Sequence, residues 1–161
     1  RLLSDVGFIQ ARLQLGAARG LHRTGRVLVR LEGGITRTDD LLALPVSLRF
    51  FAGGDQSVRG FGYQSIGPVG EEGTVIGGRH LIAGSVELEQ MVYGPFGVAV
   101  FTDAGNAFRS RGGISLNDLE QGAGFGVRWR SPIGLVRADV AWPVSRPDRG
   151  PRLHFVVGGV L

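Results

Sequence analysis

The side chains best suited to a specific interaction are one arginine and two carboxylates that lie far apart in the sequence. Arg59 lies in the stretch Val58-Arg59-Gly60-Phe61, within a glycine-rich connection that runs from 37 to 80. Glu87 and Asp103 fall on two successive segments that alternate like strands. A guanidinium group can bind carboxylates through two parallel hydrogen bonds. We therefore expect the connection to fold back and Arg59 to form an ion pair with Asp103, with Glu87 nearby.

The carboxylate partner lies in the stretch Phe101-Thr102-Asp103-Ala104-Gly105. Phe101 is expected to cover the ion pair. Each feature also has an ordinary explanation, because an arginine beside a glycine can sit in a solvated turn and Asp103 before Gly105 can mark the end of a strand. Together they favour attachment of the connection to the strands. The wall partners expected for Arg59 are Glu87, Phe101, Asp103 and Gly105.

No combination of residues suggests catalysis. His22, His80 and His154 form neither a metal-ligand spacing nor a nucleophile–base pair. The glycines of Gly122-Ala123-Gly124-Phe125-Gly126 look like part of a nucleotide-binding loop, but no helix is expected after them. We interpret them as small strand residues that leave space inside the protein. We therefore expect no catalytic residue, no metal and no cofactor, and a protein that is not an enzyme.

The composition fits one domain with scattered positive charge. The 161 residues include 28 glycines and carry a formal net charge of +4, and all 18 basic residues are arginine. These arginines form no basic run, which argues against nucleic acid as a partner. Cysteine is absent, so disulfides and thiolate metal sites are excluded. The sequence contains no run of about twenty apolar residues, so no transmembrane helix is expected.

A period of two in hydropathy runs through seven segments and predicts β-strands. In each segment apolar side chains occupy one face, and the charged side chains fall on the other face except for Arg19 at the end of the first segment. The connections alternate between short and long, as in membrane barrels, whereas a soluble sandwich with this alternation would bury its apolar faces. We therefore expect an all-β antiparallel transmembrane barrel segment with its apolar faces toward lipid. The predicted strands are 6–19, 25–36, 81–92, 96–108, 122–131, 135–144 and 152–161.

Seven strands are too few for a closed barrel of the usual kind. Bacterial single-chain barrels have an even number of antiparallel strands, and at least about eight. The first and last segments therefore need a partner, either the missing N-terminal half of the same barrel or another chain. On the lipid face, arginine at Val29 or Val140 is expected to be costly, while a change of the inward-facing Arg128 is expected to be milder.

Several stretches resemble the barrel of TamA and its relatives, which form one superfamily with BamA and the two-partner secretion transporters. Val58 to Phe61 matches the loop motif of that family, VRG followed by Phe or Tyr, and the Phe101 to Gly105 stretch matches its wall motif, FxDxG. The resemblance implies that residues 1–161 are the C-terminal portion of a sixteen-stranded outer-membrane barrel of the bacterial surface antigen type. It also implies that residues 37–80 are a long external loop that enters the lumen. The other similar stretches are 49–55, 65–68, 84–87 and 124–132.

The same resemblance implies a function in the outer membrane of a Gram-negative bacterium, as a factor for the assembly or translocation of other proteins. The implied partners are the lipid bilayer, client outer-membrane proteins and a TamB-like protein anchored in the inner membrane. The chain departs from the family pattern in having no POTRA repeats, in ending at Leu161 rather than at an aromatic residue, and in its number of strands.

Three other functions remain open from the sequence. A secretion pore of the two-partner type shares the loop and wall motifs. Another alternative is the barrel of a fused secreted hydrolase, in which this half would still be non-catalytic. A small autonomous barrel acting as a porin or binding protein is an alternative from another class. The sequence that precedes residue 1 would separate them, because POTRA repeats or a hydrolase domain would identify the branch.

Overall fold

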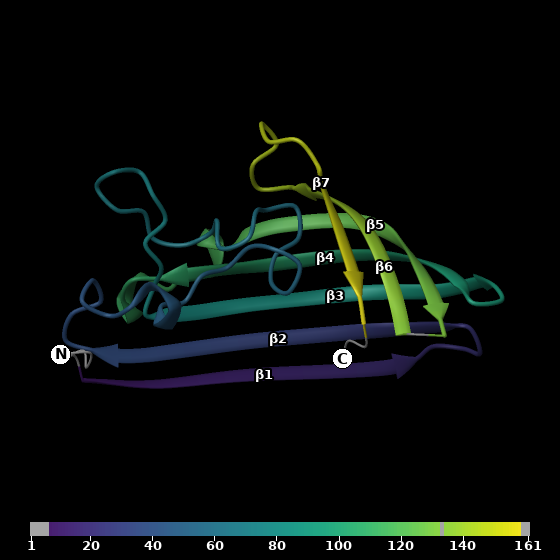
Figure 1. Cartoon of the computed structure of the whole chain (residues 1–161), viewed down its shortest axis with the longest axis horizontal. Helices are drawn as coiled ribbons and strands as arrows, with labels where there is room; N and C mark the ends of the chain where they lie inside the picture. Colours follow the sequence, from purple (N-terminus) through teal and green to yellow (C-terminus); the bar gives the residue numbers. More distant parts are fainter. Residues whose placement is uncertain (1–6, 133, 159–161) are drawn as a thin grey trace.

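The computed structural model describes residues 7–132 and 134–158, and these form one antiparallel sheet. The seven strands lie in sequence order, so each strand pairs with the one that follows it (Figure 1). Each connection is therefore a hairpin link between neighbouring strands. The strands are β1 (Phe8–Gly20), β2 (Gly25–Thr38), β3 (His80–Tyr93), β4 (Phe96–Phe108), β5 (Glu120–Ser131), β6 (Gly134–Pro143) and β7 (Arg152–Val157).

The all-β, seven-stranded prediction is confirmed, with strand ends that differ from the predicted ones by a few residues. The last strand ends at Val157. The predicted start at Val6 and the predicted continuation through 159–161 lie outside the described residues. In the described part of the chain, no helix is long and apolar enough to cross a bilayer.

The sheet is the reverse of a soluble protein, because large apolar side chains are exposed on one face and charged side chains of β3 to β6 are buried on the other. Ile9 is 74% exposed and Leu153 is 83% exposed, while Arg128 on the opposite face is 1% exposed. A sheet in water would hide the first two and expose the third. The arrangement matches a barrel wall with a lipid-facing outer surface. The other outward side chains include Leu13, Leu15, Leu31, Ile35, Val86, Leu88, Val98, Val100, Phe125, Val127, Trp129 and Phe155.

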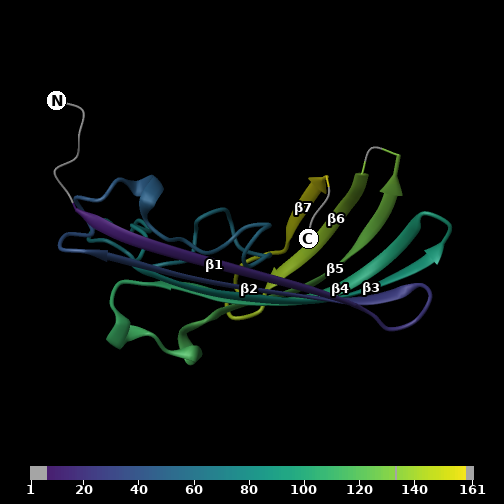
Figure 2. The same ribbon diagram turned by 90° about the horizontal axis from the view of Figure 1, so that it is seen from below.

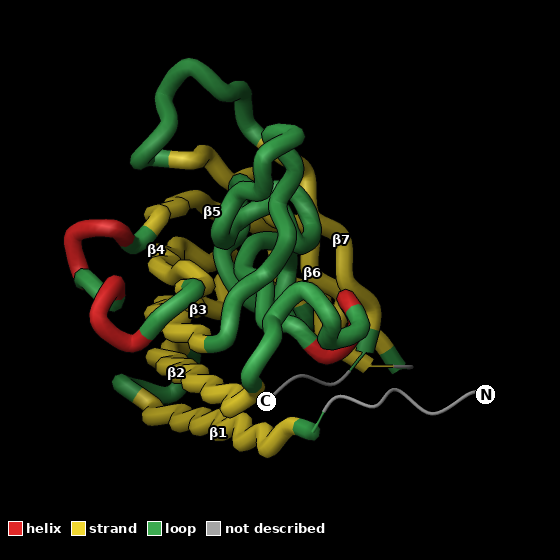
Figure 3. Tube along the Cα trace, turned by 90° about the vertical axis from the view of Figure 1, so that its left-hand side faces the viewer, coloured by secondary structure: helices red, strands yellow, loops and turns green. Residues whose placement is uncertain are grey.

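The connections alternate in length as expected. Those after β1, β3 and β5 are short, and those after β2, β4 and β6 span 39–79, 109–119 and 144–151. Figure 3 shows the strands as an arc with the long 39–79 connection inside it. Figure 2 shows the 109–119 connection, which carries the short 3-10 helices Arg111–Gly113 and Leu116–Asp118, on the other side of the sheet.

The 39–79 segment, here called the inner loop, has an apolar core of its own. It contains one 3-10 turn, Val46–Leu48, and isolated bridges such as Phe50 to Gly78 and Ala52 to Ile66. Its buried side chains pack on β3 and β4, so burial of apolar area holds the loop against the concave face of the sheet. The cluster consists of Phe50, Ala52, Val58, Phe61 and Ile66 from the inner loop, Leu81 from β3 and Ala107 from β4.

Candidate functional site: a buried ion network

Arg59 reaches from the inner loop to Asp103 on β4 and binds it at three points. Its Nε lies 2.8 Å from Asp103 Oδ2, and its Nη2 lies 2.9 Å from Asp103 Oδ1. Its backbone N–H also donates to Oδ2, at 3.0 Å. The two-pronged guanidinium contact fixes the side chain, and the backbone contact fixes the chain around it. Both residues are almost completely buried.

Three other wall residues, Glu87, Ser85 and Phe101, also contact Arg59. Its Nη1 lies 2.7 Å from Glu87 Oε2, and its Nη2 donates to Ser85 Oγ at 3.2 Å. The guanidinium carbon stands 3.4 Å above the centre of the Phe101 ring, in the geometry of a cation–π contact. The structure thus brings together the arginine, both carboxylates and the aromatic residue singled out in the sequence.

The surroundings of Arg59 act on its pKa in opposite directions. Burial alone lowers the pKa, because it disfavours the charged form. The hydrogen bonds and negative charges of Asp103, followed by those of Glu87, outweigh burial and hold the pKa above its ordinary value. Arg59 is therefore a permanent cation, and its attachment to Asp103 does not depend on its own titration.

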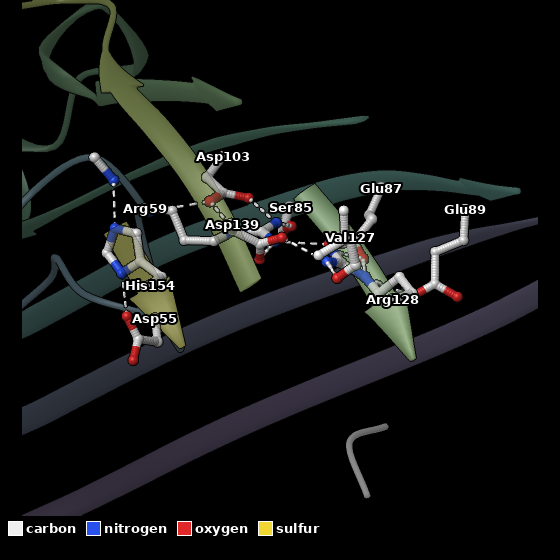
Figure 4. Close-up of polar contacts among 11 residues, drawn as sticks. Asp55, Arg59, Ser85, Glu87, Glu89, Asp103, Val127, Arg128, Asp139 and His154 are labelled. Atoms are coloured by element: carbon white, nitrogen blue, oxygen red, sulfur yellow. Dashed lines mark hydrogen bonds and ion pairs between the residues drawn. The ribbon is translucent and has the colours of Figure 1, made fainter. Parts of the chain in front are cut away.

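A second arginine, Arg128 on β5, ties the same carboxylates together. Its Nη2 lies 2.6 Å from Glu87 Oε1, its Nη1 lies 2.5 Å from Asp139 Oδ1, and its Nε lies 3.2 Å from Glu89 Oε1. Asp139 also receives Arg59 Nη1, at 3.2 Å (Figure 4). We call Arg59, Arg128, Glu87, Glu89, Asp103 and Asp139 the ion network.

The position of Arg128 changes an expectation from the sequence. A mild effect was expected on replacing it, because the inward face of a barrel is usually hydrated. In the structure its side chain is buried among three carboxylates. Removing one member of a buried ionic cluster leaves uncompensated charge, which is costly. Replacement of Arg128 is therefore expected to be strongly destabilising.

The glycines of β5 make room for this network. A Cβ on Gly122 would lie 1.9 Å from the carbonyl oxygen of Arg59, and one on Gly126 would lie 1.9 Å from Asp139 Oδ1. A Cβ on Gly124 would lie 2.6 Å from the Phe101 ring. These glycines were expected to leave space inside the protein. That space is filled by the backbone of the inner loop, the Phe101 ring and the Asp139 carboxylate.

The remaining motif residues shape the backbone of the inner loop. Gly60 has a φ of 92°, in the left-handed region, and a Cβ there would lie 2.7 Å from the carbonyl carbon of Trp142. Both facts require glycine. Val58 and Phe61 are buried in the apolar cluster of the loop. A Cβ on Gly105 would lie 3.0 Å from Val58 Cγ2, so Gly105 leaves room for Val58.

We expect Gly122→Ala to displace the inner loop. The added methyl group overlaps a backbone oxygen that cannot move without moving Arg59, and overpacking of this kind costs about 1–3 kcal/mol. The test is urea unfolding of the full-length protein together with protease accessibility of the inner loop. Gly16→Ala on β1 is the matched control, because nothing lies within 4 Å of its Cβ position. Equal behaviour of the two variants would contradict the packing argument.

Several members of the site were not singled out from the sequence. Arg128 was expected to face inward, but the sequence does not show that it shares the carboxylates of Glu87 and Asp139 with Arg59. His154 and Asp55 had no predicted role, yet His154 Nδ1 contacts Asp55 Oδ1 and its Nε2 receives the backbone N–H of Gly60 at 3.1 Å. The signal available in the sequence was the alternation of apolar and polar residues, because Arg128, Asp139 and His154 all lie on polar faces of their strands.

The chemistry of the arrangement is that of a clamp. The carboxylates of the ion network are all paired with arginine side chains. Among the residues that the structure describes, no group of three or more His, Cys, Asp or Glu side chains is arranged to hold a metal ion. The network can hold the inner loop against β3 to β6.

Comparisons with known proteins identify relatives of this fold and sequence. Residues 1–160 match the Omp85 superfamily domain. The chain is 32% identical over 162 residues to "Outer membrane protein assembly factor BamA" of Nitratidesulfovibrio vulgaris, covering 96% of this chain and 20% of that protein. It is 35% identical over 117 residues to "Outer envelope protein 80, chloroplastic" of Arabidopsis thaliana, covering 68% of this chain and 14% of that protein.

A solved structure agrees with the fold. The crystal structure of BamA from Haemophilus ducreyi lacking POTRA domains 1–3 superposes with a TM-score of 0.68 at 22% sequence identity. The match covers 85% of this chain and 32% of that chain. The chain thus spans about a fifth or less of the length of the two relatives matched by sequence, and about a third of the solved structure.

Proposed function

The chain belongs to the Omp85 superfamily, and on this premise we propose that it is the membrane-embedded part of a factor that assembles other outer-membrane proteins. Its location is the outer membrane of a Gram-negative bacterium. The proposed activity is not enzymatic. Client proteins are inserted or translocated without any covalent bond being made or broken.

The combination of an inside-out sheet with a loop clamped to its concave face supports this proposal. The outward apolar side chains suit lipid, and the ion network braces β3 to β6 from within. A plain pore needs an open interior, whereas here residues 39–79 occupy the inside of the arc (Figure 3). We propose that the inner loop stabilises the wall or gates the interior while the strands at the edges act on clients.

The edge strand β7 supplies the mechanism. It pairs with β6 on one side, and among the described residues no strand pairs with its other side. An unpaired row of N–H and C=O groups can receive a further strand through backbone hydrogen bonds. In lipid each unpaired group costs several kcal/mol, which favours pairing. We propose that a client strand pairs transiently at this edge during its insertion.

A finer proposal concerns the branch of the superfamily to which the chain belongs. The loop and wall motifs resemble those of TamA, which implies a TamB-like partner anchored in the inner membrane. The BamA relative favours general assembly of outer-membrane proteins instead. Affinity purification of the full-length protein from its own membranes separates the two, because a TamB-like protein is expected in the TamA branch only.

Site-specific crosslinking tests the proposed function. The chain has no cysteine, so Phe155→Cys on β7 introduces a single thiol into it. Side chains of directly paired strands lie about 4.5–5.5 Å apart at Cβ, which is close enough for a disulfide. In cells that synthesise a client barrel with one cysteine in its last strand, we expect an oxidised adduct between the full-length protein and that client.

The matched control is Val100→Cys on β4. Val100 also faces outward, but β4 pairs with strands on both sides. Adducts from both positions alike would show chance collision in the bilayer, and this outcome would contradict pairing at the edge. An adduct with a secreted polypeptide that is not a barrel would instead support the two-partner secretion pore.

A further inference from the structure

Arg137 on β6 is a buried cation that lacks an anionic partner in the described part of the chain. Its side chain is 8% exposed, and its Nε is buried there without a hydrogen-bond partner. The ion network does not supply one, because each oxygen of Glu87 and of Asp139 already accepts from Arg59 or Arg128. A buried charged donor left unpaired is costly, so this side chain indicates a site for an anion.

A small recess gathers further donors beside Arg137. It measures about 30 Å³, and its lining includes Arg137, Arg30 on β2 and Ser85 on β3, which lies opposite Arg30 in the register of the two strands. Ser85 Oγ accepts from Arg59 Nη2, so its own hydrogen is free to donate. Glu87 is also in the lining, but two arginines already neutralise it. The recess thus offers two cations and a hydroxyl group to a ligand.

The recess adjoins a larger cavity of about 970 Å³ on the concave side of the sheet, with which it shares part of its lining. The charge of this lining is positive, since it holds four arginines and two carboxylates. Glu32 is paired with Arg12, and Asp55 contacts His154. Neither carboxylate is therefore available to the recess, and the cavity attracts anions. The charged lining residues are Arg12, Arg30, Arg49, Arg137, Glu32 and Asp55.

A carboxylate attached to a carbon chain fits the recess and the cavity together. A guanidinium fork binds a planar carboxylate through two parallel hydrogen bonds. One water needs about 10–15 Å³ on the same volume scale, so the recess holds about two water-sized atoms, such as the two carboxylate oxygens. Phe51 and Tyr63 line the larger cavity and suit the chain that carries the carboxylate. Lipid meets the opposite face of the sheet, which favours a polypeptide over a phospholipid as the ligand.

We propose that Arg137, together with Arg30 and Ser85, binds the carboxylate of an aspartate or glutamate in a polypeptide segment that enters the concave side of the sheet. Two sources offer this chemistry. One is a segment of the full-length protein outside the described residues, and the other is a client polypeptide, which rests on the proposed function. In both cases the site holds an acidic segment against β2, β3 and β6 and disfavours a basic one.

Zero-length crosslinking of the full-length protein in its own membranes tests the site. Arg137→Lys keeps the positive charge and introduces the only lysine of residues 1–161, because all basic residues there are arginine. A carbodiimide activates a carboxylate, and an amine in contact with it then forms an amide bond while the carbodiimide leaves as a urea. Mass spectrometry identifies the aspartate or glutamate that becomes attached to the introduced amine.

Two further variants make the result decisive. Arg23→Lys, in the exposed turn between β1 and β2, is the matched control. Contact raises the effective concentration of two groups, so the amide yield from Arg137→Lys is expected to exceed that of the control by roughly tenfold or more. Arg30→Lys lines the same recess and is expected to capture the same carboxylate, so the test does not depend on the folding of one variant.

The identity of the adduct separates the two sources. An amide within the full-length protein, formed without synthesis of a client, identifies a segment of that protein as the ligand. An adduct that appears only while a client is synthesised identifies the client. The first result does not depend on the client crosslink at Phe155→Cys, so failure of the proposed function would leave it unchanged.

Three results would overturn the inference. One is an amide yield from both recess variants no higher than that of Arg23→Lys, with and without client synthesis. Another is an amide only to Glu87 or another carboxylate of the ion network, which would show that the network itself neutralises Arg137. The third is attachment of the amine to a phospholipid phosphate, which would assign the recess to a lipid headgroup instead of a polypeptide.

Discussion

Arg59→Ala is expected to detach the inner loop at a cost of about 3–5 kcal/mol, the usual penalty for removing one partner of a buried ion pair and smaller if water enters. Glu87 and Asp139 would keep Arg128, but among the described residues the hydrogen-bond donors to Asp103 all belong to Arg59. The main cost therefore comes from the buried carboxylate of Asp103, which would lose these hydrogen-bond donors. Urea unfolding and protease cleavage within the inner loop of the full-length protein measure it.

Three matched variants sharpen this test. Arg59→Lys keeps the charge but loses the two-pronged contact, so an intermediate loss is expected. Arg59→Ala combined with Asp103→Asn removes the stranded charge and should recover part of the stability. Arg146→Ala breaks an exposed pair with Glu120, and such pairs contribute about 0–1 kcal/mol. If Arg59→Ala behaved like Arg146→Ala, the ion network would not be what holds the loop.

The strands could be located closely from the sequence, because a hydropathy period of two shows which face of a strand is apolar and which is polar. The stretch around Val98 and Val100 shows this, since its alternation with Ala99 and Phe101 appears as exposed and buried side chains on β4. The alternation does not depend on which strand lies beside which. It therefore survives in the sequence of a chain that represents only part of its relatives' length.

Contacts between distant residues were predicted only where charge and motif coincided. The pairing of Arg59 with Asp103 and Glu87 was inferred in this way, and the structure brings these side chains together. Asp139 is 80 residues from Arg59, and its contact follows from the register of β5 with β6 and from the path of the inner loop. Alternation carries neither piece of information.

The same limit explains why the contacts of His154 were not predicted from the sequence. Its place on a polar face was visible in the sequence, but its partners are Asp55 and the backbone of Gly60, which lie 99 and 94 residues away. A backbone N–H has no sequence signature at all. The hydrogen bond exists because Gly60 brings the inner loop against the end of β6, where a side chain would collide with Trp142. The loop conformation had to be known first.

Val140→Arg is expected to cost about 2–4 kcal/mol if the outer face of the sheet lies in the bilayer core. Val140 is paired in register with Phe125 of β5 and Leu153 of β7, and both of these side chains point outward and are exposed. The row continues to Val100 on β4 and Leu88 on β3. An arginine in the middle of this apolar row has no carboxylate beside it and must lose its hydration. Unfolding in lipid vesicles measures the cost.

Two controls show whether lipid is the cause. Val140→Leu keeps an apolar side chain of similar size and is expected to change stability by less than about 1.5 kcal/mol. Val69→Arg places the same charge on an exposed position of the inner loop, where water can hydrate it, and a change within about 0.5 kcal/mol is expected. A large loss in Val140→Arg alone fits a lipid-facing row. Equal tolerance of arginine at Val140 and Val69 would instead mean that the outer face meets water, and the membrane orientation of the whole sheet would be wrong.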